Sequence, residues 1–376
     1  MTAGPTVLIV AGEASGDLHG ANLARAIKEL APGAVLLGAG GRKMRDAGVE
    51  LVAETTAHAA VGIVEAFHNL HHYTKLYRTL QSALKQRRPD VVVLIDYPDF
   101  NLRFAERVHD HGIPIAYYIS PQIWAWRPGR IKAIKRLVTK MIVILDFEEK
   151  LYRDAGVDSA FVGHPLLDAF KAPDRDALRR EFGGRPLIGL LPGSRRKSFA
   201  ALYPLMLKSA ELISKELPDA AFVVACARGL DPKAAAERAA KAKARVQVVW
   251  DRTPDVQAAS DLLLTASGTS TLEAALHGTP MIVTYKLNAL TAMTLGPLIK
   301  TRTFALVNIV AGREIMPEYY QSKAKPALIA REALSIVKEG RLDVMRRDLA
   351  EVRRKLGAPG ASKRAAAEVL KVAATR

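Results

Sequence analysis

The sequence contains only one cysteine, Cys226, which lies in the apolar run AFVVACA. An internal disulfide is therefore excluded, and a thiol in such a run is expected to be buried and unreactive. No stretch reaches about 18 uncharged apolar residues, the length that a membrane-spanning helix needs. The first residues, MTAGPTVLIV, lead straight into an expected strand and lack the regions of a secretory signal. We therefore expect a cytoplasmic protein without a spanning helix.

Acidic residues are in short supply: 38 Asp and Glu against 55 Lys and Arg leave a formal net charge of +17. This excess favours an anionic partner, which could be nucleic acid, a phosphorylated substrate or an anionic membrane face, although solubility alone could also explain it. Aromatic residues are scarce too, at 6%. Because the chain shows neither stacking aromatics on a sheet face nor a groove-reading helix, a nucleic-acid-binding module is a rival hypothesis rather than the favoured one.

What the sequence does contain is a series of short β-branched runs that alternate with helical stretches. Near-continuous apolar strands separated by helices are typical of parallel sheets covered by helices on both faces. The runs are TVLIVAG, AVLLGAG, DVVVLID, IPIAYYIS, KMIVILD and AFVGHP, then PLIGLLPG, AAFVVACA, RVQVVWD, DLLLTAS and PMIVTY. Since 376 residues suffice for two domains, the predicted fold class is α/β, with two doubly wound Rossmann-like domains facing a central cleft.

The boundary between the domains is expected at KAPDRDALRREFGGRP, a polar segment at about 171–186 with proline and paired glycines. This linker divides the chain into residues 1–170 and 171–344. The charged helical stretch 345–376 could pack back on the first domain. Ligands of such sheets bind beyond the carboxyl ends of the strands, so functional residues are sought there.

In the first domain, the first strand leads into the turn AGEASGDLHG, residues 11–20. It matches neither the G-x-G-x-x-G pattern of dinucleotide-binding turns nor that of a P-loop, so neither kind of site is predicted here. Its carboxylates, Glu13 and Asp17, favour recognition of sugar hydroxyls over phosphate, with Ser15 and His19 as further candidates at the cleft. The alternative is a capping turn in which Asp17 solvates a helix start.

The strand DVVVLID ends on Asp96, followed by YPDFN. A carboxylate at the carboxyl end of a parallel strand, beside the cleft, is well placed to accept a proton. Asp99 is a rival for this role and could equally cap a helix, and a purely structural role for Asp96 also stays open.

The second domain carries two turns that suit phosphate. LLPGSRRKS places the backbone at Gly193, the Ser194 hydroxyl and the Arg195 guanidinium at a helix start, where they could bind a diphosphate. TASGTSTLEAALHGTP repeats the arrangement, with Glu273 one turn into the helix, where it could bind ribose hydroxyls. The hydroxyl and glycine positions of this second turn are Ser267, Gly268, Thr269 and Ser270. Either turn could instead be a well-capped helix.

Residues 120–130, SPQIWAWRPGR, hold two of the three tryptophans and precede a basic helix. Trp124 and Trp126 suit a boundary between apolar and polar surroundings, and Gln122 and Arg127 would line the cleft with them. The basic side chains that suit lipid phosphates are Arg127, Arg130, Lys132, Lys135 and Arg136. Ile63, Phe67, Leu70 and Tyr77 at helical spacing, and the uncharged stretch 287–299, could be interfacial or simply core. The histidines of HNLHH lack partners at ligand spacing, so no metal site is predicted.

Taken together, these motifs resemble the lipid-A-disaccharide synthases, inverting glycosyltransferases of GT-B architecture. The residues that carry the resemblance spread from about residue 10 to 321: AGEASGDLHG, VGIVEAF, IDYPDFN, SPQIWAWRPGR, GHP, LPGSR, SGTSTLEAAL and LVNIVAGREIMPEYYQ. The resemblance implies that UDP-2,3-diacylglucosamine and 2,3-diacylglucosamine 1-phosphate are joined to a β-1′,6 disaccharide 1-phosphate with release of UDP. No cofactor is expected, and no metal ion either, because backbone amides and an arginine can stabilise the charge of the departing diphosphate.

Residue by residue, the resemblance implies that Asp96 is the general base and that Glu13 is a carboxylate needed for activity. It places Arg195, Glu273 and Asn308 at the donor. Ser198 departs from the family pattern LPGSRxxE, which puts the contact of that glutamate in doubt. The implied location is the cytoplasmic face of the inner membrane, with peripheral attachment to its anionic surface. The rival enzymes of the same architecture are a UDP-GlcNAc epimerase and the peptidoglycan GlcNAc transferase.

Overall fold

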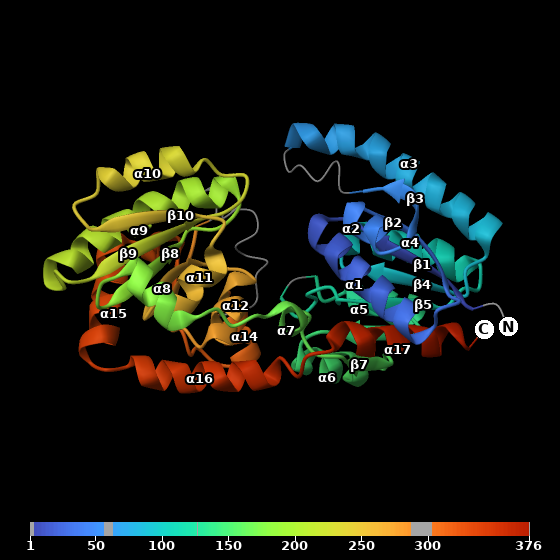
Figure 1. The fold of residues 1–376 in the computed structure, drawn as a ribbon. Coiled ribbons are helices and arrows are strands. Elements are labelled where there is room, and N and C mark those ends of the chain that lie inside the picture. The colour runs from blue at the N-terminus through green and yellow to red at the C-terminus, as the bar shows by residue number, and fades with distance from the viewer. Residues whose placement is uncertain (1–3, 56–62, 126, 287–302, 376) are drawn as a thin grey trace. The chain divides into compact units, whose positions relative to one another are not determined.

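The computed structural model describes residues 4–55, 63–125, 127–286 and 303–375, except for the side chains of residues 63–72. The chain divides into two compact units, Met1–Ala169 with Leu356–Arg376, and Phe170–Lys355 (Figure 1). Trp126, the stretch 287–299 and the side chains of Ile63, Phe67 and Leu70 lie outside the described part of the chain.

The first unit contains a seven-stranded, entirely parallel sheet in the order β3-β2-β1-β4-β5-β6-β7. β4 reads VVVLI and all five of its residues are buried, as expected for a central strand covered on both faces. The strands are β1 Thr6–Ala11, β2 Val35–Gly40, β3 Glu50–Glu54, β4 Val91–Ile95, β5 Ile115–Tyr118, β6 Lys140–Val143 and β7 Ser159–Phe161.

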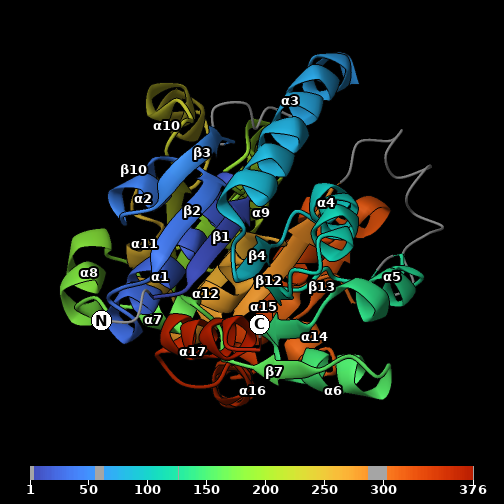
Figure 2. The same cartoon turned by 90° about the vertical axis from the view of Figure 1, so that its right-hand side faces the viewer.

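Helices cover both faces of this sheet, because alternate strand residues point to opposite sides. Val7, Ile9 and Ala11 of β1 face the α1 and α17 side, whereas Leu8 and Val10 face the α3 and α4 side (Figure 2). The helices of this unit are α1 Ala14–Leu30, α2 Arg42–Asp46, α3 Ile63–Arg87, α4 Pro98–Asp110, α5 Arg130–Leu137, α6 Asp146–Asp154, α7 Leu166–Ala169 and α17 Ala361–Ala373.

The second unit contains a six-stranded parallel sheet in the order β10-β9-β8-β11-β12-β13. Its strands are β8 Leu187–Leu191, β9 Ala221–Cys226, β10 Val246–Trp250, β11 Leu262–Ala266, β12 Met281–Tyr285 and β13 Glu318–Tyr320. Its helices are α8 Arg175–Phe182, α9 Arg196–Glu216, α10 Pro232–Ala240, α11 Thr253–Ala259, α12 Ser270–His277, α14 Leu306–Ala311, α15 Pro326–Lys338 and α16 Leu342–Lys355, with the 3₁₀ turn η3 Gln321–Lys323. Cys226 is buried, as predicted.

All eleven strands predicted from the apolar runs are present, and two further strands were not predicted. β3 reads ELVAE and β13 reads EYY, with every residue exposed or half-buried. These strands lie at sheet edges, so they lack the continuous apolar pattern that identifies central strands.

The structure corrects two details of the predicted organisation. The expected linker 171–186 contains α8, which packs into the second unit because Phe182 is buried and Arg179 pairs with Asp261 at 2.7 Å. α16 also belongs to the second unit, where it buries three apolar residues against α12 and α14. Only the part from Leu356 onward returns to the first unit.

Candidate active site

Each sheet reverses its strand order at one point, and the candidate residues lie there. In the first sheet β1 and β4 are neighbours, with Ala11 opposite Ile95. Glu13 and Asp96 therefore follow two paired strand ends. In the second sheet β8 and β11 are neighbours, with Leu191 opposite Thr265. Open α/β sheets bind their ligands at such switch points, because the helices on the two sides diverge there.

The turn after β4 holds Asp96 in an unusual backbone conformation. Asp96 and Tyr97 have φ angles of 46° and 49°, in the left-handed region that non-glycine residues seldom adopt. The buried Asn101 donates hydrogen bonds to the carbonyls of Ile95 and Asp96, at 3.2 and 2.7 Å, and the Tyr117 hydroxyl donates to Asp96 O at 2.6 Å. These bonds stabilise a strained turn of the kind that is concentrated at functional sites.

Glycine at position 12 is required by the same turn. A Cβ built on Gly12 would lie 2.2 Å from Cδ1 of Tyr97, so the Tyr97 ring packs directly on the backbone of the first turn. Tyr97 in turn stacks on Phe100, with ring centroids 5.6 Å apart. The two turns that carry Glu13 and Asp96 are thus packed against each other.

The electrostatic surroundings of Asp96 suit proton transfer near neutral pH. Burial of its carboxyl among protein atoms raises the pKa of Asp96 to about 6; a hydrogen bond from Tyr97 lowers it, and the nearby Glu13 carboxylate adds a smaller rise. Although protein atoms crowd the carboxyl, Asp96 is exposed as a residue, so water still reaches it. A carboxylate that is ionised at pH 7 but has a raised pKa is a stronger base than an ordinary aspartate.

Asp17 has a different role from the one predicted. Its side chain is buried, and its two oxygens accept hydrogen bonds from the backbone N–H groups of Gly41, Lys43 and Met44 at 2.8, 3.1 and 3.0 Å. It therefore caps the start of α2, and not its own helix as the alternative had it. Three of the roughly four acceptor sites of the carboxylate are thus used within the protein, and a contact of Asp17 with substrate stays a prediction.

The other candidates on this turn differ in exposure. Ser15 is exposed, and His19 is half-buried with Nδ1 lacking a hydrogen-bond partner among the described residues. Burial, followed by the charge of Lys43, lowers the pKa of His19 to about 4. The pKa of His164 is also lowered to about 4, by burial and then by His19, so these two imidazoles are neighbours and neutral at pH 7.

Residues 121–130 connect β5 to α5 and are attached to the helices that follow the two neighbouring strands. Trp124 Nε1 donates to Glu148 Oε1 at 3.0 Å, and its ring meets Phe147 edge-on with centroids 5.5 Å apart. Arg127 pairs with Asp99 at 2.8 Å, and Arg130 pairs with the same carboxylate. Asp99 is thus a partner for this segment rather than a rival base. Gln122 is exposed, and Trp126 lies outside the described residues.

In the second unit, the turn after β8 presents the predicted anion-binding groups. Gly193 has a φ of 100°, and Ser194 and Arg195 are exposed at the start of α9. Ser198 lies against the turn, since a Cβ at Gly193 would be 3.2 Å from the Ser198 Cβ. The charge of Arg195 acts on Tyr285 at the end of β12, so the guanidinium is near the carboxyl ends of the strands.

In the turn after β11, some of the hydroxyl groups are used in hydrogen bonds within the protein. Ser270 Oγ donates to Ala266 O at 3.3 Å and Ser267 Oγ donates to Phe304 O at 3.1 Å, whereas Thr269 is exposed. Gly268 has a φ of 147°. Glu273 is half-buried, and burial raises its pKa, partly offset by Gln257. The two predicted phosphate turns lie on adjacent strands, as the sequence suggested.

Asn308 is buried, and its side chain is hydrogen-bonded to the segment 315–318. Its Oδ1 accepts from Ile315 N and Met316 N, both at 2.9 Å, and its Nδ2 donates to Met316 O at 2.8 Å and Glu318 Oε1 at 2.7 Å. All its hydrogen-bonding capacity is used within the protein. The donor contact that the resemblance implies for Asn308 stays a prediction, and the structure shows the side chain bonded within the protein.

Sequence reasoning missed three supporting residues: Glu148, Asn101 and Glu318. Glu318 accepts from Phe304 N, Ala305 N and Asn308, so it orders the chain next to the second turn. In the sequence, Glu148 and Asn101 are marked only as polar residues in otherwise apolar helix faces. The partner of Glu148 is 24 residues away, and the partners of Asn101 are backbone carbonyls of a turn whose conformation the sequence does not reveal, so this signal could not say what either residue binds.

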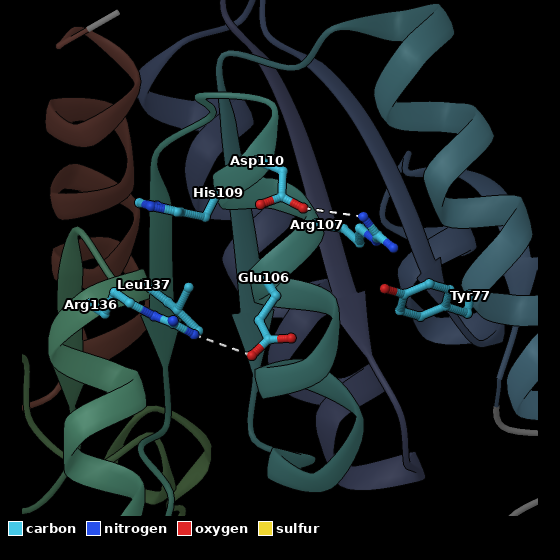
Figure 3. Close-up of a pocket in the computed structure, with 7 residues that line it drawn as sticks. All are labelled: Tyr77, Glu106, Arg107, His109, Asp110, Arg136 and Leu137. Atoms are coloured by element: carbon cyan, nitrogen blue, oxygen red, sulfur yellow. Dashed lines mark hydrogen bonds and ion pairs between the residues drawn. The ribbon is translucent and has the colours of Figure 1, made fainter.

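The depression in Figure 3 is not part of this site. It has a volume of about 460 Å³ and is lined by Tyr77 of α3 and by the last turns of α4 and α5, at the end of α4 that is remote from Asp96. Its charges compensate one another, because Glu106 pairs with Arg136 and Arg107 with Asp110, both at 3.2 Å. Among the described residues there is no cluster of metal-ligating side chains and no helix able to cross a membrane.

Comparison with solved structures shows the fold. The glycotransferase of kitacinnamycin aligns with a TM-score of 0.67 at 18% identity, covering 98% of this chain and 99% of that one. The UDP-GlcNAc 2-epimerase from Neisseria meningitidis, bound to UDP-GlcNAc, aligns with a TM-score of 0.58 at 11% identity, covering 99% and 100%. Both likenesses establish the two-domain Rossmann-like architecture and nothing finer.

Comparison of sequences is more specific. The lipid-A-disaccharide synthase of Syntrophus aciditrophicus (strain SB) is 45% identical over 370 residues, and that of Geobacter sulfurreducens is 42% identical over 371 residues. Each alignment covers 97% of both proteins. A family model described as lipid-A-disaccharide synthetase matches residues 7–372. The chain therefore belongs to the lipid-A-disaccharide synthetase family.

Proposed function

We propose that this enzyme of lipid A disaccharide synthesis transfers the diacylglucosaminyl group of UDP-2,3-diacylglucosamine to 2,3-diacylglucosamine 1-phosphate. The product is the β-1′,6 disaccharide 1-phosphate, and UDP is released. The single observation that carries the mechanism is the position of Asp96 at the switch point of its sheet, with a pKa raised to about 6. Family membership supports the choice of reaction.

In the proposed reaction, Asp96 removes the proton from the 6-hydroxyl of the acceptor. The hydroxyl oxygen then forms a bond to the anomeric carbon of the donor while the bond from that carbon to the diphosphate oxygen breaks. Attack opposite the leaving group inverts the configuration. Glu13 lies beside Asp96 and strengthens it as a base by raising its pKa. General-base assistance of this kind contributes about 10²–10⁴-fold to the rate.

The departing UDP gains negative charge, which the second unit is suited to stabilise. Arg195 at the start of α9 and the N-terminus of α12 after Thr269 supply a guanidinium and backbone N–H groups. Groups of this type act most strongly where charge develops in the transition state. We assign this role to the protein groups without a metal ion.

We further propose that the enzyme works at the cytoplasmic face of the inner membrane, held there peripherally. The support is the net charge of +17 together with substrates that carry acyl chains and phosphate. The basic side chains of the 121–136 region are the candidates for this contact, although two of them also pair with Asp99.

Product analysis tests the reaction. Purified enzyme is incubated with UDP-2,3-diacylglucosamine and 2,3-diacylglucosamine 1-phosphate, and the expected products are UDP and the disaccharide in equal amounts. Unacylated UDP-GlcNAc should give neither transfer nor epimerisation. A matched control is Asp110→Asn, on the far end of the helix that Asp96 precedes, which should retain full activity. Epimerised UDP-sugar without transfer would refute the proposal.

Arg195 tests the assignment of the donor site. Arg195→Ala should weaken UDP binding about 10–100-fold, the loss expected for charge-assisted hydrogen bonds to a diphosphate. Isothermal titration with UDP measures the change directly. Arg238→Ala, which removes an exposed arginine of α10, serves as the control for net charge. Equal UDP affinity in Arg195→Ala and the parent would contradict the assignment.

A further inference from the structure

Glu148, the third residue of α6, is a buried carboxyl that the proposed mechanism does not use. Its residue exposure is 2%, and burying a carboxyl is costly unless polar groups compensate it. Its Oε1 accepts from Trp124 Nε1 at 3.0 Å. The Ser120 hydroxyl and the backbone N–H groups of Leu145 and Ile144 also lie near this carboxyl, but among the described residues neither its Oε2 nor the Ser120 Oγ makes a hydrogen bond of good geometry. Packing alone does not require a carboxyl here, because an apolar side chain would fill the same space at lower cost.

The partner of Glu148 belongs to a segment that follows a central strand of the first sheet. β5 lies between β4 and β6, and residues 121–130 leave its carboxyl end. Through Trp124 the segment is attached to α6, which follows β6. Through Arg127 and Arg130 it is attached to Asp99 in the first turn of α4, which follows β4. Asp96 stands two residues before α4.

We propose that Glu148 is a positioning residue that, through its hydrogen bond with the Trp124 indole, holds residues 121–125 and 127–130 across the carboxyl edge of the first sheet beside Asp96. The two attachments lie on opposite sides of β5, so loss of either frees the segment to move relative to the Asp96 turn. The inference rests on the proposed function, because this position matters to catalysis only if Asp96 acts on the acceptor.

The protonation of Glu148 should be measurable near neutral pH. Burial raises the pKa of Glu148 to about 7, while the Trp124 indole, the Ser120 hydroxyl and the backbone N–H groups of Leu145 and Ile144 act to lower it. The Tyr152 hydroxyl, from the same helix, also faces this carboxyl and donates to Pro121 O at 3.1 Å. The ionised carboxylate is the stronger acceptor, so the Trp124 bond is tightest above that pH.

Tryptophan emission tests the contact without any substrate. The chain has three tryptophans, and a Trp126→Phe/Trp250→Phe background leaves Trp124 as the only emitter. We expect its emission to show one transition with a midpoint near pH 7. Glu148→Gln should abolish that transition, whereas Asp154→Asn, which changes an exposed acid of the same helix, should preserve it. A transition that persists in Glu148→Gln, or no transition in the parent, overturns the inference.

Kinetics test the consequence for catalysis. We expect Glu148→Ala to raise the acceptor KM at least tenfold with a smaller change in kcat, and Glu148→Gln, which keeps an acceptor for the indole, to restore part of the loss. The double variant Glu148→Ala/Trp124→Phe should raise the acceptor KM no more than the single variant with the larger effect does. Multiplicative losses in the double variant would overturn the inference, since the two residues would then act separately.

Binding of UDP separates this inference from the proposed function. UDP affinity should be unchanged in every Glu148 variant, because the donor groups lie in the second unit. If the parent enzyme bound no UDP and formed no disaccharide, the proposed function would fail. The emission experiment would still show whether Glu148 contacts the Trp124 indole. If Glu148→Ala does not fold, Glu148→Gln and Trp124→Phe provide the same comparison of KM with kcat.

Discussion

At the scale of single residues, Asp96 shows how backbone and charge act together. A left-handed φ is maintained by Asn101 and Tyr117, which bind the Asp96 carbonyl and leave its carboxyl available for chemistry. The same position places the carboxyl among protein atoms and near Glu13, and both raise its pKa. The aspartate side chain supplies the carboxyl group, and its position in the turn raises the pKa of that group.

The pH dependence of the reaction follows from that pKa. Because the base must be deprotonated, kcat/KM should fall about tenfold per pH unit below pH 6 and level off above it. Asp96→Asn should lower kcat by about 10²–10⁴-fold and leave UDP affinity unchanged. Steady-state rates between pH 5 and 8, with UDP titration alongside, make the measurement. A flat profile down to pH 5, or lost UDP affinity in Asp96→Asn, would rule out the assigned role.

Asn308 illustrates the opposite case, a residue assigned to the donor whose side chain is fully used inside the protein. Asn308→Ala should lower the free energy of unfolding by about 2–4 kcal/mol, because it leaves the buried N–H groups of Ile315 and Met316 without acceptors. Denaturant unfolding with and without UDP measures this. A variant as stable as the parent but with weakened UDP binding would favour direct contact instead.

At the scale of elements, the start of α17 is capped by one exposed carboxylate of the first unit. Asp168 accepts from Gly360 N, Ala361 N and both donors of Ser362, at 2.6 to 3.1 Å, and so caps the start of α17. α17 then buries Ala365, Val369 and other small side chains in the core that it shares with α1. The cap therefore stabilises a long-range contact rather than a local turn.

Asp168→Ala should destabilise the protein by about 1 kcal/mol, the usual cost of losing a helix N-cap. Burial acts to raise the pKa of Asp168, but the hydrogen bonds of Ser362, Gly360 and Ala361 outweigh it and lower the pKa. The carboxylate thus stabilises the fold above the ordinary aspartate pKa and ceases to do so as pH falls through the lowered value. Thermal unfolding of parent and variant should converge at low pH, with Asp174→Asn in the second unit for comparison.

The sequence predicted those elements whose pattern is local. Eleven strands lie in apolar runs that are visible in the sequence, and the glycine and hydroxyl turns after β8 and β11 are visible as short motifs. The boundary of the second unit was misplaced because a charged helix such as α16 has the same amphipathic pattern whichever unit it packs on. The roles of Asp17, Asn308 and Glu148 depend on partners that the fold brings together from 7 to 27 positions away.

At the scale of the whole molecule, the formal charge of +17 is large for a chain of this length. Binding to vesicles that contain anionic lipid should therefore weaken steeply as salt increases, because screening shortens the range of the attraction to a few ångströms at about 1 M. Co-sedimentation across a salt series measures it, with neutral vesicles for comparison. If binding to anionic vesicles did not change with salt concentration, insertion of apolar side chains into the bilayer would be indicated instead.

The return of the chain to its first unit has a consequence for biosynthesis. During translation the whole of Phe170–Lys355 is made before α17, so α1 lacks its neighbour until residues 361–373 have been made. The C-terminal half can thus complete its folding while the N-terminal half, made earlier, still exposes an apolar helix face to chaperones.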